Sequence, residues 1–219
     1  MRPPTECRWQ FLPHSEWPPD EEVVAIGADL EPDTVLYAYA HGMFPMYVDK
    51  KSRMLGWWSP FERGVIPLDG FHISRSMRNS VQHFVCTVNV AFVRVMQECA
   101  TARTDGNWIN QEFIDAYTVL HEMGHAHSVE VWNKKGELVG GLYGLRINGF
   151  FAGESMFHRE TDASKVALMH LVDLMNLDGM QLLDTQWNTD HLSSLGCTSV
   201  PRPEYLALLT KAIVPPPLS

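Results

Sequence analysis

The sequence predicts an α+β protein whose larger part contains a mixed, mainly antiparallel sheet. The first observation behind this prediction is a change of hydrophobic period after residue 124, from the helical repeat of about 3.6 residues to the two-residue repeat of strands. The second is the order of the elements that follow: three strands in succession, then alternating helices and strands. Of the 219 residues, 45% are hydrophobic and 20% are charged, which is enough apolar material for a packed core.

The first sixty residues are rich in proline, tryptophan and acidic residues, and they predict a small side domain. One helix is expected at residues 32–41, where Gly42 ends it. The composition changes between residues 60 and 67. We therefore expect a small N-terminal α/β domain over residues 1–62 and a larger domain over residues 63–219.

The middle of the chain is expected to be helical. Helices are predicted at residues 74–80, 90–103 and 111–123, with a loop at residues 104–108. In the third helix, apolar residues recur at helical spacing, and Gly124 is well placed to end it.

The strands of the larger domain follow. Three alternating strands are predicted at residues 127–132, 137–147 and 150–157, and Asn148 and Gly149 form the strongest short hairpin signal between the last two. Asp162 is then expected to cap a helix over residues 163–177. The remaining elements are a strand at 181–186, a short helix at 190–195, a strand after Gly196 and a helix at 203–213. This order occurs in the second half of acetyltransferase-like (GNAT) folds, so the larger domain is expected to be GNAT-like.

Composition excludes several classes of protein. The longest apolar run, residues 84–93, is ten residues long, whereas roughly 20 are needed to span a bilayer. The first ten residues contain two prolines and an acid where a signal peptide needs an apolar stretch, so a cytoplasmic protein is expected. The four cysteines are scattered, with no C-x-x-C pair, so neither a zinc knuckle nor a redox motif is predicted.

Charge is distributed unevenly along the chain. The net charge is −9, yet residues 61–110 contain five arginines and four acidic residues. Arg63, Arg75 and Arg78 lie in this stretch. They form either a local basic patch or an ordinary solvated surface, and the pattern alone leaves both interpretations open.

Two short patterns place polar groups within predicted strands. Alternation puts Glu154 on the same face as Ala152 and Met156, which is costly unless a partner satisfies the carboxylate. It is expected either to hold a cationic ligand group or to pair with an internal cation such as Arg159 or Lys165. Asp184 and Gln186 stand two residues apart on the strand predicted at 181–186, so their side chains are expected to point the same way. Asp184 is expected to accept from the Gln186 amide and orient its carboxamide, for an amine ligand or as a structural hydrogen bond.

A third pattern resembles a zinc site. His121, Glu122 and His125 fit the H-E-x-x-H motif of zinc proteases, in which both histidines lie one turn apart on a helix. Gly124 stands inside the motif and a strand is expected from residue 127, so His125 is predicted to fall in the turn. The geometry of a zinc site is therefore expected to fail, and no metal is predicted.

Several runs together resemble the leucyl/phenylalanyl-tRNA protein transferase family. They occur in family order over about residues 22–210. These runs are GMFP at 42–45, WWSP at 57–60, HISRS at 72–76, NWI at 107–109, GHAHSVEVW at 124–132, ELVGGLYG at 137–144, GESMF at 153–157, ASK at 163–165, D-x-Q at 184–186, SLG at 194–196 and PR at 201–202.

The resemblance implies an aminoacyltransferase that uses no cofactor. It implies transfer of Leu or Phe, and less readily Met, from aminoacyl-tRNA to the α-amine of proteins beginning with Arg or Lys. The product would be an N-degron that marks the protein for degradation. The tRNA would be held mainly through its 3′ end, and a monomer is expected.

The resemblance also implies roles for individual residues. Glu154 would hold the basic side chain of the acceptor, and Gln186, oriented by Asp184, would receive the attacking amine. The other implied sites are a pocket for the donor side chain, a site for the terminal adenosine, and contacts with the tRNA backbone. The donor pocket would be formed by Leu142, Met156, Leu168, Leu171 and Leu183. The adenosine site would be formed by Trp108, Tyr39 and Tyr117, and the backbone contacts by Arg63, Arg75 and Arg78.

The chain departs from the family pattern at a few positions. The family usually has Trp where Met46 stands and often an aromatic residue where Leu171 stands, and the glycine pair before Asp29 is reduced to Gly27 and Ala28. These departures bear on the choice of donor amino acid and not on the reaction. Two alternatives remain open: a zinc protease, and a non-catalytic module that binds tRNA or peptide.

Overall fold

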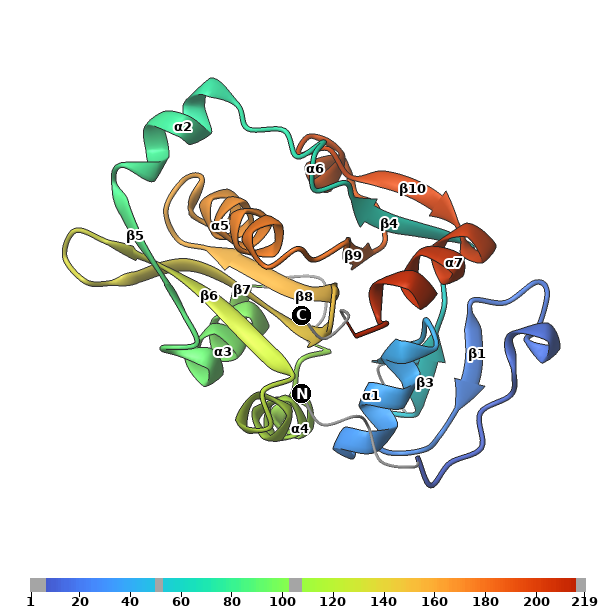
Figure 1. The fold of residues 1–219 in the computed structure, drawn as a ribbon. Coiled ribbons are helices and arrows are strands. Elements are labelled where there is room, and N and C mark those ends of the chain that lie inside the picture. Colours follow the sequence, from blue (N-terminus) through green and yellow to red (C-terminus); the bar gives the residue numbers. More distant parts are fainter. Residues whose placement is uncertain (1–6, 50–52, 103–107, 216–219) are drawn as a thin grey trace.

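The structure, a computed structural model, describes residues 7–49, 53–102 and 108–215. In these residues the chain forms two sheets with helices around them (Figure 1). The predicted α+β class with a mixed, mainly antiparallel sheet is confirmed. The first six residues and most of the predicted loop, at 104–107, lie outside the described residues.

The smaller sheet is formed near the start of the chain. It has the strand order β1-β3-β2, with antiparallel pairs, and consists of β1 (Val23–Ile26), β2 (Phe44–Tyr47) and β3 (Leu55–Trp58). Between β1 and β2 the predicted helix is confirmed as α1 (Pro32–Ala40), and a short 3-10 helix (His14–Glu16) precedes β1. A proline at the first helical position is compatible with helix geometry because its missing N–H would have no partner there.

The larger sheet has seven strands in the order β10-β4-β9-β8-β7-β6-β5. All neighbouring pairs are antiparallel except β8 and β9, which run parallel at the centre of the order. The strands are β4 (Glu62–Ile66), β5 (Phe84–Val88), β6 (Ala126–Asn133), β7 (Leu138–Ile147), β8 (Phe150–His158), β9 (Leu182–Gln186) and β10 (Thr198–Pro201).

Helices cover both faces of this sheet (Figure 1). Neighbouring residues along β7 point into different core clusters: Leu142 packs in the cluster that contains α5, and Tyr143 packs in the cluster that contains α3 and α4. The helices are α2 (Arg75–Val81), α3 (Phe92–Ala102), α4 (Gln111–Glu122), α5 (Ala163–Leu177), α6 (Asp190–Ser193) and α7 (Arg202–Ala212). Within the described part of the chain, no helix combines the length and apolar character needed to cross a bilayer.

The structure differs from the local predictions at β5 and at Asp162. The segment that forms β5 was not predicted to be a strand, although it pairs with β6 at the edge of the larger sheet. Asp162 stands at the N-cap position of α5, but its side chain does not cap the helix. Its backbone is left-handed, with φ of 67°, and its carboxylate accepts hydrogen bonds from Ser80 and Lys165 instead.

Candidate functional site

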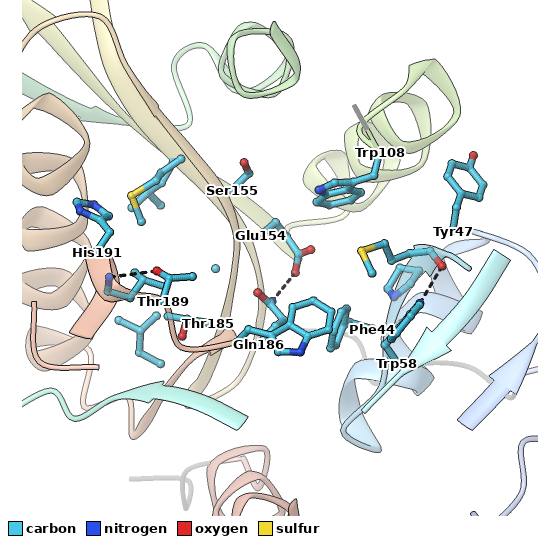
Figure 2. Close-up of a pocket in the computed structure, with 18 of the residues that line it drawn as sticks. Phe44, Tyr47, Trp58, Trp108, Glu154, Ser155, Thr185, Gln186, Thr189 and His191 are labelled. Carbon is cyan, nitrogen blue, oxygen red and sulfur yellow. Dashed lines mark hydrogen bonds between the residues drawn. The ribbon is translucent and has the colours of Figure 1, made fainter. Parts of the chain in front are cut away.

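A cavity of about 1010 Å³ is lined by both sheets and by α5. Figure 2 shows Glu154 and Gln186 near its middle, with Trp108, Phe44 and Trp58 on one side and Thr189 and His191 on the other. The lining residues are Phe44, Pro45, Met46, Tyr47, Val48, Arg53, Trp58, Trp108, Asn110, Leu142, Gly153, Glu154, Ser155, Met156, Leu168, Leu171, Leu183, Thr185, Gln186, Trp187, Thr189, His191 and Leu192.

The residues predicted to form the donor pocket all line this cavity. Strands β7, β8 and β9 supply Leu142, Met156 and Leu183, and α5 supplies Leu168 and Leu171. The sheet and the helix that packs on it therefore bring five apolar side chains from distant parts of the chain to one place. Such a surface can bury an aliphatic or aromatic group of a ligand.

An aromatic wall stands on the other side of Glu154. The rings of Phe44 and Trp58 meet that of Trp187 edge-on, with centroids 5.0 and 6.1 Å apart, and all three rings line the cavity. Trp108, predicted to contact the terminal adenosine, also lines it and packs edge-on against Phe113. Wide π-faces of this kind suit the stacking of a nucleobase.

Glu154 occupies an irregular position on β8. Along the β7–β8 pair, Tyr143 faces Ser155 and the next residue, Gly144, faces Gly153, so the pairing skips Glu154. This bulge reverses the alternation: Ala152 packs in the cluster of α3 and α4, while Met156 packs against that of α5. The prediction that Ala152, Glu154 and Met156 share one face was therefore wrong.

The carboxylate of Glu154 has no cationic partner among its hydrogen-bond donors. Tyr39 Oη donates to Oε1 over 2.6 Å and Gln186 Nε2 donates to the same oxygen over 3.3 Å. The internal cations considered from the sequence are engaged elsewhere, Arg159 with Glu98 and Lys165 with Asp162. Burial raises the pKa of Glu154 from 4.5 to about 8, although the hydrogen bond from Tyr39 acts in the opposite direction.

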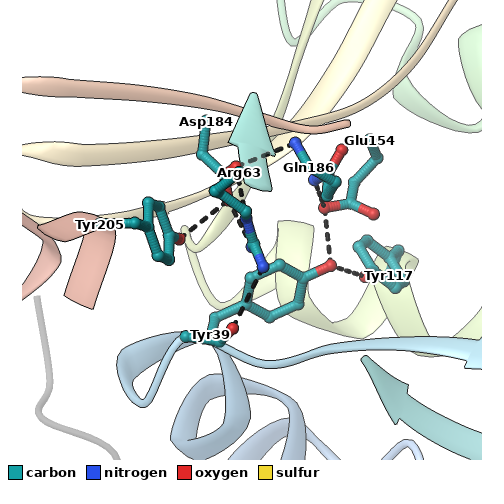
Figure 3. A network of polar contacts seen from close by, with 8 residues as sticks. Tyr39, Arg63, Tyr117, Glu154, Asp184, Gln186 and Tyr205 are labelled. Atoms are coloured by element: carbon teal, nitrogen blue, oxygen red, sulfur yellow. Dashed lines mark hydrogen bonds and ion pairs between the residues drawn. The ribbon is translucent and has the colours of Figure 1, made fainter. Parts of the chain in front are cut away.

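Tyr39 and Tyr117 do not line the cavity. Both side chains are fully buried, and their hydroxyls lie 2.7 Å apart, in a chain of hydrogen bonds that ends on Glu154 (Figure 3). From this position neither ring offers a face to a ligand in the cavity. The prediction that they line an adenosine site is corrected: their contact with the site is through Glu154.

Asp184 is the centre of a second group of hydrogen bonds, drawn in Figure 3. Its Oδ1 accepts from Arg63 Nε at 2.8 Å and from the backbone N–H of Gln186 at 2.9 Å. Its Oδ2 accepts from Arg63 Nη2 at 2.7 Å and from Tyr205 Oη at 3.0 Å. The predicted contact between Asp184 and Gln186 is present, but it involves the main chain of Gln186 and not its side-chain amide.

The backbone at Gln186 is unusual. Its φ is +61°, a left-handed conformation that costs energy for a residue with a side chain. The β4–β9 pairing skips Thr185 just before it, because Gly64 faces Gln186 and Val65 faces Asp184. A Cβ on Gly64 would lie 2.7 Å from the backbone nitrogen of Asn188, so the close approach of this turn requires glycine.

Arg63 does not contribute to an exposed basic patch. Its side chain is 1% exposed and forms an ion pair with Asp184, whose side chain is 0% exposed. Burial alone would lower the pKa of Arg63, but the adjacent Asp184 carboxylate raises it above its ordinary value. The prediction that Arg63 contacts the tRNA backbone was wrong because the guanidinium has no access to a ligand phosphate. Arg75 and Arg78, on α2, are exposed as predicted.

The H-E-x-x-H residues are not arranged as a zinc site. Helix α4 ends at Glu122, so His125 lies beyond the helix and just before β6. His121 stacks on Phe92 at a centroid distance of 4.2 Å, and its Nδ1 lies 2.8 Å from the Ala126 carbonyl oxygen. In the described residues, no group of three or more His, Cys, Asp or Glu side chains could hold a metal ion.

Several lining residues were not predicted individually as site residues. Phe44 and Trp58 stand in motifs that were quoted for the resemblance, and Trp187 follows Gln186 directly. A search of these motifs for large aromatic residues would have found Phe44 and Trp58, and Trp187 stands one residue beyond a motif. Arg53 belongs to no motif and was not predicted.

Comparisons with known proteins found matches to one family. The family described as leucyl/phenylalanyl-tRNA protein transferase matches residues 65–210, and the family described as its N-terminal domain matches residues 28–60. A leucyl/phenylalanyl-tRNA–protein transferase of Stutzerimonas stutzeri is 48% identical over 85% of this chain and 83% of its own length. One of Pseudoalteromonas atlantica is 43% identical over 89% of this chain and 83% of its own length.

Solved structures with a similar arrangement are remote. FemX aligns with a TM-score of 0.48 and 12% identity, over 78% of this chain and 67% of its own. A GCN5-related N-acetyltransferase from Kribbella flavida aligns with a TM-score of 0.41 and 12% identity, over 78% of this chain and 61% of its own.

Proposed function

Because the chain belongs to the leucyl/phenylalanyl-tRNA protein transferase family, and is therefore an aminoacyl-tRNA-dependent protein aminoacyltransferase, we propose the following substrates. It transfers Leu or Phe, and less readily Met, to the α-amine of proteins that begin with Arg or Lys. The extended N-terminus then serves as an N-degron. The zinc-protease alternative is not favoured, because His125 lies off the helix that holds His121.

One observation supports these substrates above all others. The cavity joins an apolar end, built by Leu142, Leu171 and their neighbours, to a single carboxylate, Glu154, beside the carboxamide of Gln186. An apolar donor side chain matches the first part and a basic acceptor side chain matches the second. The aromatic wall that includes Trp108 is where the terminal adenosine of the tRNA stacks.

The reaction needs little acid or base catalysis. The α-amine nitrogen attacks the carbonyl carbon of the aminoacyl ester, and the C–O bond to the ribose breaks. The departing ribose oxygen takes up a proton, and the amine loses one. Since an α-amine has a pKa of about 7.7–8.0, roughly a fifth to a third of it is already neutral near pH 7.4. Gln186 orients this amine, and the main contribution of the enzyme is proximity.

The environment of Glu154 supports its role as the acceptor's partner. Its oxygen accepts from two neutral groups, Tyr39 and Gln186, so neither of these hydrogen-bond donors carries a positive charge that would favour the ionised carboxylate. A guanidinium or ammonium group of the acceptor supplies the missing positive charge. Gln186 binds Glu154 through Nε2, so its carboxamide oxygen stays available for the α-amine of the acceptor's first residue.

A transfer assay tests the proposal. Purified protein is mixed with radiolabelled Leu-, Phe-, Met- or Arg-tRNA and with one of two peptides that differ only in beginning with Arg or Ala. We expect label on the Arg peptide from Leu-tRNA and Phe-tRNA, a weaker signal from Met-tRNA and none from Arg-tRNA. Equal labelling of the Ala peptide would contradict the role of Glu154, and transfer from Arg-tRNA would contradict the apolar donor pocket.

A further inference from the structure

Arg63 makes contacts that join several parts of the molecule. Its guanidinium binds both oxygens of Asp184 on β9, and its Nη1 donates to the Gly42 carbonyl oxygen, at 3.1 Å, just before β2. The same group lies over the rings of Phe44 and Tyr205, 4.8 and 4.4 Å from their centroids. One buried side chain of β4 therefore touches the smaller sheet, β9 and α7.

A buried ion pair is weak support for a purely stabilising role. Desolvating both charges opposes the attraction between them, and apolar side chains of similar volume often stabilise a core as well or better. What distinguishes this pair is that its carboxylate also binds the backbone of Gln186. Asp184 Oδ1, held by Arg63 Nε, also accepts from the backbone N–H of Gln186.

Gln186 depends on this hydrogen bond for its orientation. Its φ of +61° is costly, and the skipped residue Thr185 interrupts the β4–β9 pairing immediately before it. The ladder is interrupted at this turn, and the Asp184 carboxylate supplies the hydrogen bond that holds the Gln186 backbone N–H. With four donors on its two oxygens, Asp184 has no acceptor position left for a proton from the substrate amine.

The other contacts of Arg63 lead to the opposite wall of the cavity. Phe44, on which the guanidinium lies, lines the cavity and packs edge-on against Trp187. We propose that Arg63 is a positioning residue for aminoacyl transfer: it fixes Asp184, and through it Gln186, relative to the aromatic wall formed by Phe44. This inference rests on the proposed role of Gln186 in receiving the acceptor amine.

The test is a comparison of Arg63→Lys with Arg202→Lys. Lysine keeps the charge but loses the two-pronged contact with Asp184. Arg202 is a matched control, because its guanidinium also lies over an aromatic ring, Phe61 at 4.6 Å, and also donates to backbone carbonyls, yet it contacts neither Asp184 nor Gln186. Tyr205→Phe is the milder variant, since it removes one donor to Asp184 and leaves the ring in place.

Steady-state transfer of Leu from tRNA to an Arg peptide gives kcat and both KM values. We expect Arg63→Lys to lower kcat about tenfold or more, with both KM values changed less than about twofold, and Tyr205→Phe to lower kcat by a smaller factor. Arg202→Lys should keep the wild-type kcat. In ¹H–¹⁵N spectra, the Gln186 amide should shift in Arg63→Lys and in Asp184→Asn but not in Arg202→Lys.

Two further variants separate the possible failures. If Arg63 acts through Asp184, the double variant Arg63→Lys/Asp184→Asn loses no more kcat than Asp184→Asn alone. The inference would be overturned by additive losses in the double variant, or by a kcat for Arg63→Lys equal to that of Arg202→Lys. In either case an inactive Gln186→Ala would leave the proposed role of Gln186 standing. An active Gln186→Ala would overturn the proposed role of Gln186 itself, and this inference with it.

Discussion

At the scale of single residues, Glu154 combines two properties that normally exclude each other. We propose that it binds a cation, yet its pKa of about 8 leaves most of it protonated near neutral pH. The cause is burial, which disfavours the ionised form until a positive charge arrives. Binding of a basic side chain therefore releases a proton, and affinity for the acceptor must depend on pH.

The KM for an Arg-initiated peptide should fall as the pH rises from about 6 to about 8.5. Between the pKa of Glu154 in the complex and its value of about 8 in the free enzyme, the change approaches tenfold per pH unit. Titration of the peptide's own amine adds to this in every enzyme. The Glu154→Gln variant, measured with the same peptide, shows the amine titration alone. The difference between its KM profile and that of the wild type is therefore the contribution of Glu154. Parallel KM profiles for the two enzymes would contradict the proposed contact.

The same carboxylate should reduce the stability of the fold at alkaline pH. Its folded pKa, about 8, lies above its ordinary value of 4.5, so the folded state binds more protons between these values. This contribution to stability is fully present below about pH 4.5 and is lost as the pH rises to about 8. Glu154→Gln should gain on wild type by up to about 4 kcal/mol in free energy of unfolding between about pH 5 and pH 8.5. Urea unfolding at both pH values measures this gain, and a constant difference would disprove the coupling.

At the scale of secondary-structure elements, both proposed reaction groups stand at interruptions of strand pairing. The β7–β8 ladder skips Glu154, and the β4–β9 ladder skips the residue before Gln186. Bulges turn a side chain out of the regular alternation and often occur beside active sites. Since β8 and β9 are adjacent and parallel, their bulges bring Glu154 and Gln186 within 3.3 Å.

Gly64→Ala should damage the second of these bulges. The added Cβ would lie 2.6 Å from Thr185 Oγ1 and 2.7 Å from the backbone carbon of Trp187, so the turn that carries Gln186 must move. We expect a loss of about 1–3 kcal/mol in stability. The fall in kcat should be larger than this loss of stability explains. Gly70→Ala is the control, because its nearest contact is with Pro67 Cβ at 3.3 Å. Wild-type kcat in Gly64→Ala would show that the turn tolerates displacement.

The same scale shows which parts of the fold the sequence predicts. Regular periodicity located α1, α4, α5 and the strands β6 to β8 to within about two residues. The strands β1 to β5 were missed. Each has only four or five residues, which is too short to display a clear period. Bulges are also invisible to periodicity, since a skipped residue is determined by the neighbouring strand.

For the site, the resemblance was more informative than the pattern. It supplied Trp108, Glu154, Gln186 and the five apolar residues that line the cavity. It misplaced Arg63, Tyr39 and Tyr117, whose side chains are buried beneath the cavity instead of lining it. Burial depends on contacts far apart in the chain, such as that between Arg63 and Asp184, and no local pattern reports it.

At the scale of the whole molecule, we propose that the chain divides near residue 62, into 1–62 and 63–219. The smaller sheet is complete before this point, and β4, the first strand of the larger sheet, starts there. The cavity takes Phe44 and Trp58 of its aromatic wall from the first part, and Trp108, Trp187 and its apolar end from the second. Arg63, directly after the boundary, contacts both.

Charge at this scale poses a problem for tRNA binding, because the net charge of −9 repels a polyanion. Attraction must then come from a few exposed cations and from stacking of the terminal base. With Arg63 buried, Arg75 and Arg78 on α2 are what remains exposed of the predicted patch, and we propose that they contact the tRNA backbone.

Replacing both by alanine should therefore weaken tRNA binding in a salt-dependent way. Each lost phosphate contact lowers the slope of log affinity against log salt by about 0.7–0.9, so the double variant should lose up to about 1.4–1.8. Its KM for Leu-tRNA should rise most at low salt, while kcat at saturation is unchanged, because neither arginine lines the cavity. Arg94→Ala, which removes an exposed arginine on α3, controls for the loss of charge alone. An unchanged slope in the double variant would mean that stacking and the apolar pocket hold the tRNA without help from α2.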